Sequence, residues 1–269
     1  MSESASSPPE PSRRLRAALA VVAAAIPLVP IMVAVGLGGG RGATAQTANS
    51  ATVFNPVAVP KISAPSLLVP PGPGTLVALV QRGTQMRSRP GGPTYAKLSV
   101  HTEFGSPEAM WVVRLSGRWL GVISPKAGNG RVGWIPAAAA SLSRVNWKLE
   151  VSLSARRLTV LRAGRAVAHF TVAIGAPSAP TPTGRFAVTD RLRTGDPAGP
   201  YGCCILALSA QAPHAIQGWS GGNRIAIHST PETSSIGLAI SHGCLRLTLA
   251  QGRWLLSHIP LGTPTLISG

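Results

Sequence analysis

From residue 75 to the end of the chain, apolar residues occur in short runs that glycine, proline and asparagine separate. Short apolar runs with turn residues between them predict β-strands rather than helices. The chain is therefore predicted to be mostly β, with a small β domain at 75–143 and a larger β-rich domain at 146–269. The expected strands lie at 76–80, 111–115, 119–123, 132–135, 148–153, 158–161, 167–174 and 186–189.

One helix is expected in the second domain. Thr248 can cap a helix over 249–258, because its hydroxyl can accept a backbone N–H of the first turn. Pro260 and Gly262 are expected to end that helix, and residues 263–267 to form a final strand.

The N-terminal part of the chain has the pattern of a membrane-targeting segment. Residues 17–38 are apolar and almost uncharged, and three arginines precede them. About 20 apolar residues span a bilayer, and positive charge before the span holds the N-terminus inside. We expect a cytoplasmic N-terminus at 1–16, a transmembrane anchor at 17–38 and a Pro/Ala-rich linker at 39–74. A cleaved secretion signal, with small residues at 43–45 as the cleavage site, is the alternative.

The chain is strongly basic, with a formal net charge of +17. A cationic surface can attract nucleic acid, anionic lipid or a polyanionic cell wall. Because the targeting segment places the rest of the chain outside the cytoplasm, we expect the cell envelope as its location and the anionic cell wall as its partner. Contact with the membrane is expected through the N-terminal helix, and no contact with nucleic acid is expected.

Three cysteines occur in the chain, at positions 203, 204 and 244. They are not the even, spaced set that staples a small secreted domain, so the fold must rest on its apolar core. A bond between adjacent cysteines closes a small, strained ring, and Cys203 and Cys204 are therefore expected to be ordinary apolar side chains. The alternative is that one of them lies near Cys244 and forms an inactivating disulfide with it.

A thiol and two imidazoles gather around one glycine, in Ser241-His242-Gly243-Cys244 and in the preceding His228. This pattern indicates a nucleophile, Cys244, with His228 as its base. A nearby imidazole or a helix N-terminus is expected to hold much of the thiol ionised at neutral pH, and His228 is the best candidate. His242 shares the backbone run of the thiol and is given an orienting role, and backbone N–H groups around Gly243 are the candidate oxyanion donors.

Two other interpretations of the same atoms remain open. One is a structural cluster with no chemistry. The other is a zinc site, but the paired Cys-x-x-Cys or His-x-x-x-His spacings that zinc favours do not occur in the chain. We predict no metal and no cofactor.

Residues 241–247 resemble the active-site signature of the L,D-transpeptidase (YkuD-type) family. Residues 179–186, with Thr-Pro-Thr-Gly, and 199–202, with Gly-Pro-Tyr-Gly, are similar to other segments of that family, in family order. The resemblance covers 146–269 and implies a β-rich catalytic domain. It implies Cys244 as the nucleophile and His228 as the proton donor and acceptor.

The resemblance further implies that the carbonyl of Ser229 orients His228, and that peptidoglycan stem peptides are the substrate. Tyr201, Ser241 and Arg246 are expected to contact the stem peptide, with bracing of the loop as the alternative role of Arg246. The implied reaction is 3→3 cross-linking through a cysteine acyl-enzyme. Carbapenem-type β-lactams are expected to acylate the same cysteine.

Residues 118–122 and 131–135 are similar to bacterial SH3-like domains. This resemblance implies that 75–143 is a small SH3-like β-barrel that positions the enzyme on peptidoglycan, and a spacer without a ligand is the alternative. Three other functions remain open. The same fold can serve as an L,D-carboxypeptidase or attach proteins to the wall, and the chain can instead be a non-catalytic wall-binding protein.

Overall fold

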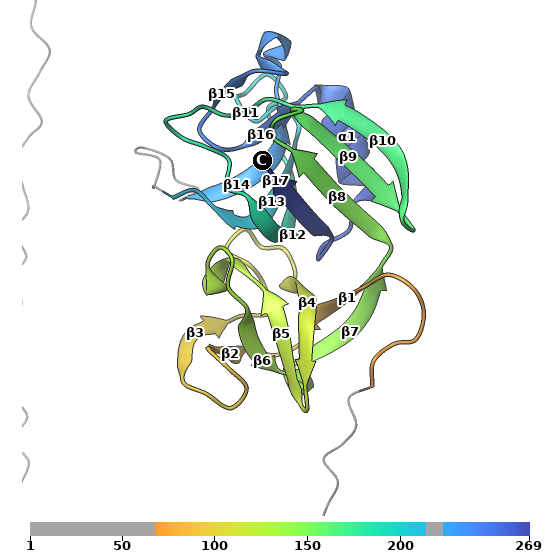
Figure 1. Ribbon diagram of the computed structural model, residues 1–269, viewed down its shortest axis with the longest axis vertical. Helices are drawn as coiled ribbons and strands as arrows, with labels where there is room; N and C mark the ends of the chain where they lie inside the picture. The colour runs from red at the N-terminus through yellow and green to blue at the C-terminus, as the bar shows by residue number, and fades with distance from the viewer. Residues whose placement is uncertain (1–67, 214–222) are drawn as a thin grey trace, which may run out of the picture. The chain divides into compact units, whose positions relative to one another are not determined.

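The computed structural model describes residues 68–213 and 223–269 of the chain (Figure 1). The predicted cytoplasmic N-terminus at 1–16, the predicted anchor at 17–38 and most of the predicted linker lie outside these residues. Within the described ranges, no helix combines the length and the apolar character needed to cross a membrane.

The first sheet has seven strands in the order β3-β2-β6-β5-β4-β1-β7, all antiparallel. Its core contains large, fully buried side chains that include Met86, Met110, Leu120 and Ile135. The strands are β1 Thr75–Val80, β2 Thr84–Arg87, β3 Thr94–Leu98, β4 Ala109–Ser116, β5 Trp119–Ile123, β6 Gly133–Pro136 and β7 Ala140–Val145. Short 3-10 turns lie at η1 Pro125–Ala127 and η2 Ala137–Ala139. The region 75–143 is therefore β, as predicted, and its likeness to SH3 domains stays a prediction.

The second sheet has eight strands in the order β10-β9-β8-β17-β12-β13-β14-β16, and β11 pairs with β15 beside it. Two of its pairings are parallel, β17 with β8 and β14 with β16. The strands are β8 Trp147–Ser152, β9 Arg157–Arg162, β10 Arg165–Thr171, β11 Ile174–Gly175, β12 Gly184–Arg193, β13 Cys204–Gln211, β14 Arg224–Ser229, β15 Ala239–Ser241, β16 Leu245–Leu247 and β17 Pro264–Ser268. A 3-10 turn, η3 Thr233–Ser235, precedes β15.

The helix α1 spans Leu249–His258, as the sequence predicts. Thr248 accepts the N–H of Gln251, and the Gln251 side chain accepts the N–H of Thr248, which forms a capping box. The helix buries Gly252, Leu255 and Leu256. Leu255 and Leu256 belong to the same core cluster as the large apolar side chains of β13 and β14.

Polar contacts join loops of the first sheet to the second. Thr102 donates to the buried carboxylate of Asp190, and Arg224, at the start of β14, forms an ion pair with Glu103. The side-chain amide of Asn129 also bonds both backbone groups of Gln211, at 2.7 and 2.9 Å. The strand β14 is thus held at its first residue by a contact from the neighbouring sheet.

Candidate active site

Cys244 lies directly before β16 and is 8% exposed. Its thiol is the only free one among the cysteines, all of which lie in the described ranges. The Sγ atom accepts a hydrogen bond from the Ala226 N–H on β14 at 3.4 Å. Burial raises the pKa of the Cys244 thiol, and the Ala226 N–H and the charge of Arg246 oppose that rise. The resting thiol is therefore protonated at neutral pH.

His228 is the fifth residue of β14 and is 3% exposed. Its Nδ1 lies 2.8 Å from the carbonyl oxygen of Ser229. Because a carbonyl can only accept, Nδ1 carries the proton and Nε2 is left as the basic nitrogen of the neutral ring. Burial lowers the pKa of His228 to about 4, with the charge of Arg246 adding to this effect and the Ser229 carbonyl opposing it.

The parallel pairing of β14 with β16 brings these two side chains to one face of the sheet. Ile227 is opposite Leu245 and His228 is opposite Arg246. Because side chains alternate between the two faces of a sheet, Cys244, two residues before Arg246, lies on the same face as His228. Residues diagonally placed on adjacent strands lie within reach of long side chains. No hydrogen bond between Cys244 and His228 occurs among the described residues. Resting pairs of this kind are often loose and tighten when substrate binds.

Tyr201 also contacts this face. Its ring meets the His228 ring edge-on, with centroids 5.0 Å apart. Burial raises the pKa of the Tyr201 phenol, and negative charge on Cys244 raises it further. Cys244, His228 and the aromatic ring of Tyr201 therefore converge at the end of β14.

The expectation of a thiol that is largely ionised at rest is wrong. Burial disfavours both the thiolate and the imidazolium, so Cys244 and His228 are each uncharged near neutral pH. The arrangement fits a base that removes the thiol proton during attack, rather than a preformed ion pair.

Two buried hydroxyls hold the turn before Cys244. Ser241 accepts the Gly243 N–H at 3.1 Å and donates to the Cys244 carbonyl at 2.6 Å. Thr181 donates to the Gly243 carbonyl at 2.8 Å and accepts the Gly175 N–H at 2.9 Å. Gly243 has φ +108°, a conformation that glycine adopts without strain. Its N–H is already bonded, so it is not a free oxyanion donor, whereas the Cys244 N–H has no acceptor in the described part of the chain.

Comparison with known proteins places residues 146–267 in a family. The L,D-transpeptidase catalytic domain model, YkuD, matches residues 146–267. The YkuD protein of Bacillus subtilis strain 168 is 32% identical over 124 residues, which cover 46% of this chain and 67% of that protein. The chain belongs to the YkuD family of L,D-transpeptidases.

Two further matches carry the same family name. L,D-transpeptidase 1 of Mycobacterium tuberculosis H37Rv is 31% identical over 129 residues, which cover 44% of this chain and 49% of that protein. The crystal structure of an L,D-transpeptidase from Mycobacterium tuberculosis H37Rv matches with a TM-score of 0.38 and 20% identity, covering 51% of this chain and 72% of that one. Enzymes of this class are acyltransferases, and Cys244 and His228 both lie inside the range that the family model matches.

The remaining predicted site residues differ in their surroundings. Ser241 is 1% exposed and both hydrogen bonds of its hydroxyl are to the backbone of its own turn, which favours positioning over substrate contact. His242 is exposed and makes no hydrogen bond within residues 68–213 and 223–269, so its orienting role stays a prediction. The Arg246 side chain is 22% exposed, with Nη1 3.7 Å from the carboxylate of Glu232 and a buried Nε that has no partner among the described residues.

The expectation that Cys203 and Cys204 are ordinary apolar side chains is wrong, because they are bonded to each other. Neither is an ordinary apolar thiol, and neither bridges to Cys244, which is free. The pair packs on Ser229, whose Oγ lies 3.5 Å from the Cys203 Sγ and accepts the Cys204 N–H at 3.1 Å. The bonded pair therefore supports the residue whose carbonyl holds His228.

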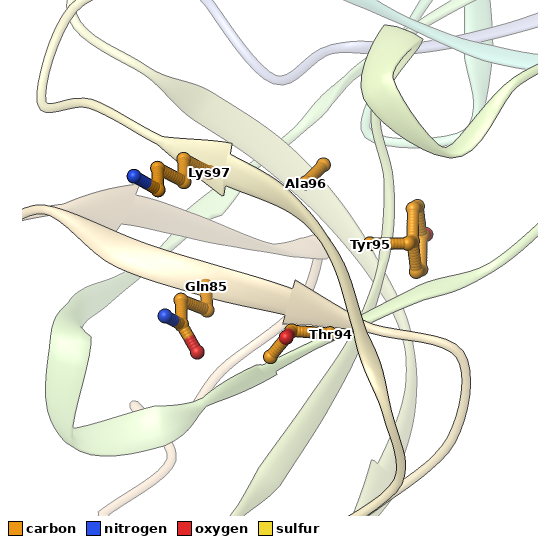
Figure 2. Close-up of a pocket in the computed structure, with 5 residues that line it drawn as sticks. All are labelled: Gln85, Thr94, Tyr95, Ala96 and Lys97. Carbon is orange, nitrogen blue, oxygen red and sulfur yellow. The ribbon is translucent and has the colours of Figure 1, made fainter. Parts of the chain in front are cut away.

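Two further findings on this member of the YkuD family concern metal binding and a surface pocket. Across the described ranges, no group of three or more His, Cys, Asp or Glu side chains could hold a metal ion. A shallow pocket of about 260 Å³ is formed by Gln85 of β2 and by Thr94, Tyr95, Ala96 and Lys97 of β3 (Figure 2). It belongs to the first sheet and contains none of the candidate site residues.

Thr181 is the site residue that sequence reasoning missed. The Thr-Pro-Thr-Gly segment was an available signal, but it indicated only family membership. The partner of Thr181, Gly243, lies 62 residues further along the chain, and no local pattern predicts that contact.

Proposed function

We propose that the chain is a peptidoglycan L,D-transpeptidase that forms 3→3 cross-links through an acyl-enzyme on Cys244. The observation that carries this proposal is a buried thiol on the same face of the sheet as an uncharged imidazole whose Nδ1 is held by the Ser229 carbonyl. Family membership supplies the substrate class, the stem peptides of the wall.

In the first half-reaction, Cys244 Sγ attacks the carbonyl of the third residue of a donor tetrapeptide stem. His228 Nε2 accepts the thiol proton as the C–S bond forms. The oxyanion that develops faces the Cys244 N–H. His228 then gives the proton to the nitrogen of the terminal D-alanine, the C–N bond breaks, and a thioester remains.

In the second half-reaction, an amine of a neighbouring stem attacks the thioester. His228 accepts the proton of that amine, the C–S bond breaks and the thiol is restored. The product is a 3→3 link, and no ATP and no cofactor enter either step. His228 is neutral at the start and at the end of each half-reaction. Its low pKa keeps this basic form available well below neutral pH.

We place Arg246 and Tyr201 at the substrate. The Arg246 guanidinium remains partly exposed beside the reacting pair and can attract a stem carboxylate. The Tyr201 ring, edge-on to His228, offers an apolar surface for a stem side chain. The proposed setting is the cell envelope, with residues 17–38 as the membrane anchor and the +17 charge favouring the anionic wall.

The test of the proposal is product analysis with the full-length protein and Cys244→Ala. Wild type incubated with a disaccharide tetrapeptide is expected to release D-alanine and yield a 3→3 dimer, detected by mass spectrometry. Cys244→Ala is expected to lose this activity while melting at the temperature of the wild type. Cross-linking by Cys244→Ala would refute the assignment.

The same experiment separates the other functions. Free tripeptide without dimer indicates an L,D-carboxypeptidase, in which water resolves the thioester. Transfer of the stem to a protein amine, with no dimer, indicates an attachment enzyme. Binding to wall fragments without any release of D-alanine indicates a wall-binding protein.

A further inference from the structure

We propose that Thr181 is a positioning residue for the reaction, because its hydroxyl sets the direction of the Cys244 N–H that receives the oxyanion. This inference rests on the proposed function, since it assigns a part in acyl transfer to a residue that touches neither the thiol nor the base. Four observations carry it in sequence.

The first observation is that both hydrogen-bonding directions of the Thr181 hydroxyl are in use. The residue is 4% exposed, and its Oγ1 accepts the N–H of Gly175 at 2.9 Å. The hydroxyl proton is thereby left to point at the carbonyl of Gly243, 2.8 Å away. A buried hydroxyl with both directions satisfied has a defined orientation.

The second observation concerns the peptide that joins Gly243 to Cys244. All described peptide bonds are trans, and in a trans peptide the C=O and N–H groups point in opposite directions in one plane. Because Thr181 fixes the Gly243 carbonyl, it also fixes the direction of the Cys244 N–H.

The third observation is that the two backbone groups next to this peptide are occupied. Ser241 takes the Gly243 N–H and the Cys244 carbonyl. Within the described residues the N–H groups of His242 and Cys244 are without an acceptor, and of the two only the Cys244 N–H shares its peptide with the carbonyl that Thr181 holds. A donor held in place before the reaction costs no reorganisation when charge develops.

The fourth observation is that Thr181 is itself held beside the turn. The strands β11 and β15 run parallel, with Gly175 opposite Ser241, and the Ala176 N–H donates to the Ser241 carbonyl at 2.8 Å. The segment that follows β11 therefore returns over the turn of Cys244. Without such a brace the turn would depend on Gly243, which has φ +108° and few conformational limits.

The test compares two reactions of the same thiol in the full-length protein. Acylation of Cys244 by p-nitrophenyl acetate forms a C–S bond, breaks the ester C–O bond and passes through an oxyanion. Alkylation of Cys244 by iodoacetamide displaces iodide and forms no oxyanion at the reacting carbon. A residue that positions the oxyanion donor should affect the first reaction and spare the second.

Thr181→Val removes the hydroxyl and keeps the shape of the side chain. We expect acylation to slow by about 10- to 100-fold, with alkylation changed less than about twofold. Thr181→Ser, which restores the hydroxyl, is expected to recover most of the acylation rate. The matched control is Thr265→Val, because Thr265 is also buried and its hydroxyl has no partner among the described residues. Both rates of this variant should equal those of the wild type.

Three results would overturn the inference. They are an unchanged acylation rate in Thr181→Val, an equal fall of both rates, or no recovery in Thr181→Ser. If Thr181→Val does not fold, Thr181→Ala and Thr181→Ser are compared in the same way. Failure of the proposed function is a separate outcome: wild type then reacts with the ester and not with the tetrapeptide, and the Thr181 comparison is still decided by the ester. A wild-type Cys244 that accepts no acyl group would overturn both.

Discussion

At the residue scale, burial sets the protonation states of Cys244 and His228. Cys244 and His228 are 8% and 3% exposed, and the cost of burying charge raises the pKa of the thiol and lowers that of the imidazole. A thiol that stays protonated at rest is protected from oxidation, which needs the thiolate. Such a pair becomes reactive when a carbonyl is in place and the proton can move to His228.

The low pKa of His228 predicts the pH dependence of acylation. His228 acts as a base only when neutral, and it stays neutral down to about pH 4. Wild type is therefore expected to keep its acylation rate constant (kcat/KM) from pH 7 to about pH 5, with the acidic limb near pH 4. The measurement is Cys244 acylation by a carbapenem followed by intact mass across this range. An acidic limb near pH 6.5 would show that His228 titrates as an ordinary histidine and contradict this account.

At the element scale, α1 supports the position of His228 through one close contact with β14. Gly252 of α1 faces Ser229, and a Cβ at this position would lie 2.7 Å from the Ser229 Cβ and 3.3 Å from the Cys204 Cβ. Ser229 in turn holds His228 through its carbonyl. The contact of Gly252 with Ser229 thus connects α1 to the His228 imidazole through a single residue.

Gly252→Ala tests this contact. Alanine in place of glycine inside a helix would by itself stabilise it by up to about 1 kcal/mol. At this position overpacking against Ser229 is expected to outweigh that gain, with a net destabilisation of about 1 to 3 kcal/mol and slower acylation. Urea unfolding and carbapenem acylation measure the two effects.

The control is Arg253→Ala, because Arg253 is exposed on the same helix. Both of its values should remain near those of the wild type. Stabilisation by Gly252→Ala would mean that the space beside Ser229 is larger than the structure indicates.

The elements also show which parts of the fold the sequence can predict. The strand expected at 119–123 is β5, and the helix expected at 249–258 is α1, because a continuous apolar run and a capping threonine mark them locally. The strands β2 and β3 gave no such signal, since most of their side chains are polar or exposed. The run at 167–174 divides between β10 and β11, with Val172 and Ala173 between them. That break depends on tertiary partners, since Ala173 pairs with Arg246.

The residues of the site divide in the same way, into those that a local sequence pattern marks and those that depend on tertiary contacts. Cys244, Gly243 and His228 could be selected because thiol, glycine and imidazole occur at a short, ordered spacing. The hydrogen bond from Thr181 to the Gly243 carbonyl and the bond between Cys203 and Cys204 could not be predicted, because they depend on contacts that form only in the folded chain. The protonation of the pair was mispredicted for the same reason, since burial is a property of the fold.

At the scale of the whole molecule, a buried acid lies near the contacts between the two sheets. Glu108 is 2% exposed, and burial raises its pKa to about 7. Lys126 and Arg224 lower this pKa, while the negative charges of Glu103 and Asp190 raise it. Because the pKa of the folded state is above that of the unfolded chain, ionising Glu108 favours unfolding.

The raised pKa of Glu108 predicts that the free energy of unfolding falls as pH rises from about 4.5 to 7, because the folded state binds one more proton than the unfolded chain in that window. Glu108→Gln cannot ionise and should remove this slope, stabilising the protein at pH 8 by up to about 3 kcal/mol. Urea unfolding at pH 5 and pH 8 measures it. Glu150→Gln serves as the control, since its side chain is 43% exposed and its ion pair adds little. Equal slopes in wild type and Glu108→Gln would show that Glu108 ionises normally in the folded protein.

The central claim is that Cys244 becomes acylated by a stem peptide with His228 as the base. The most direct measurement is acid quenching of full-length protein mixed with a disaccharide tetrapeptide, followed by digestion and mass mapping. We predict a disaccharide-tripeptide thioester on the peptide that contains Cys244, formed rapidly by wild type and orders of magnitude more slowly by His228→Ala. Tetrapeptide turnover with Cys244 unmodified at every time point, or with the acyl group on another residue, would contradict the account.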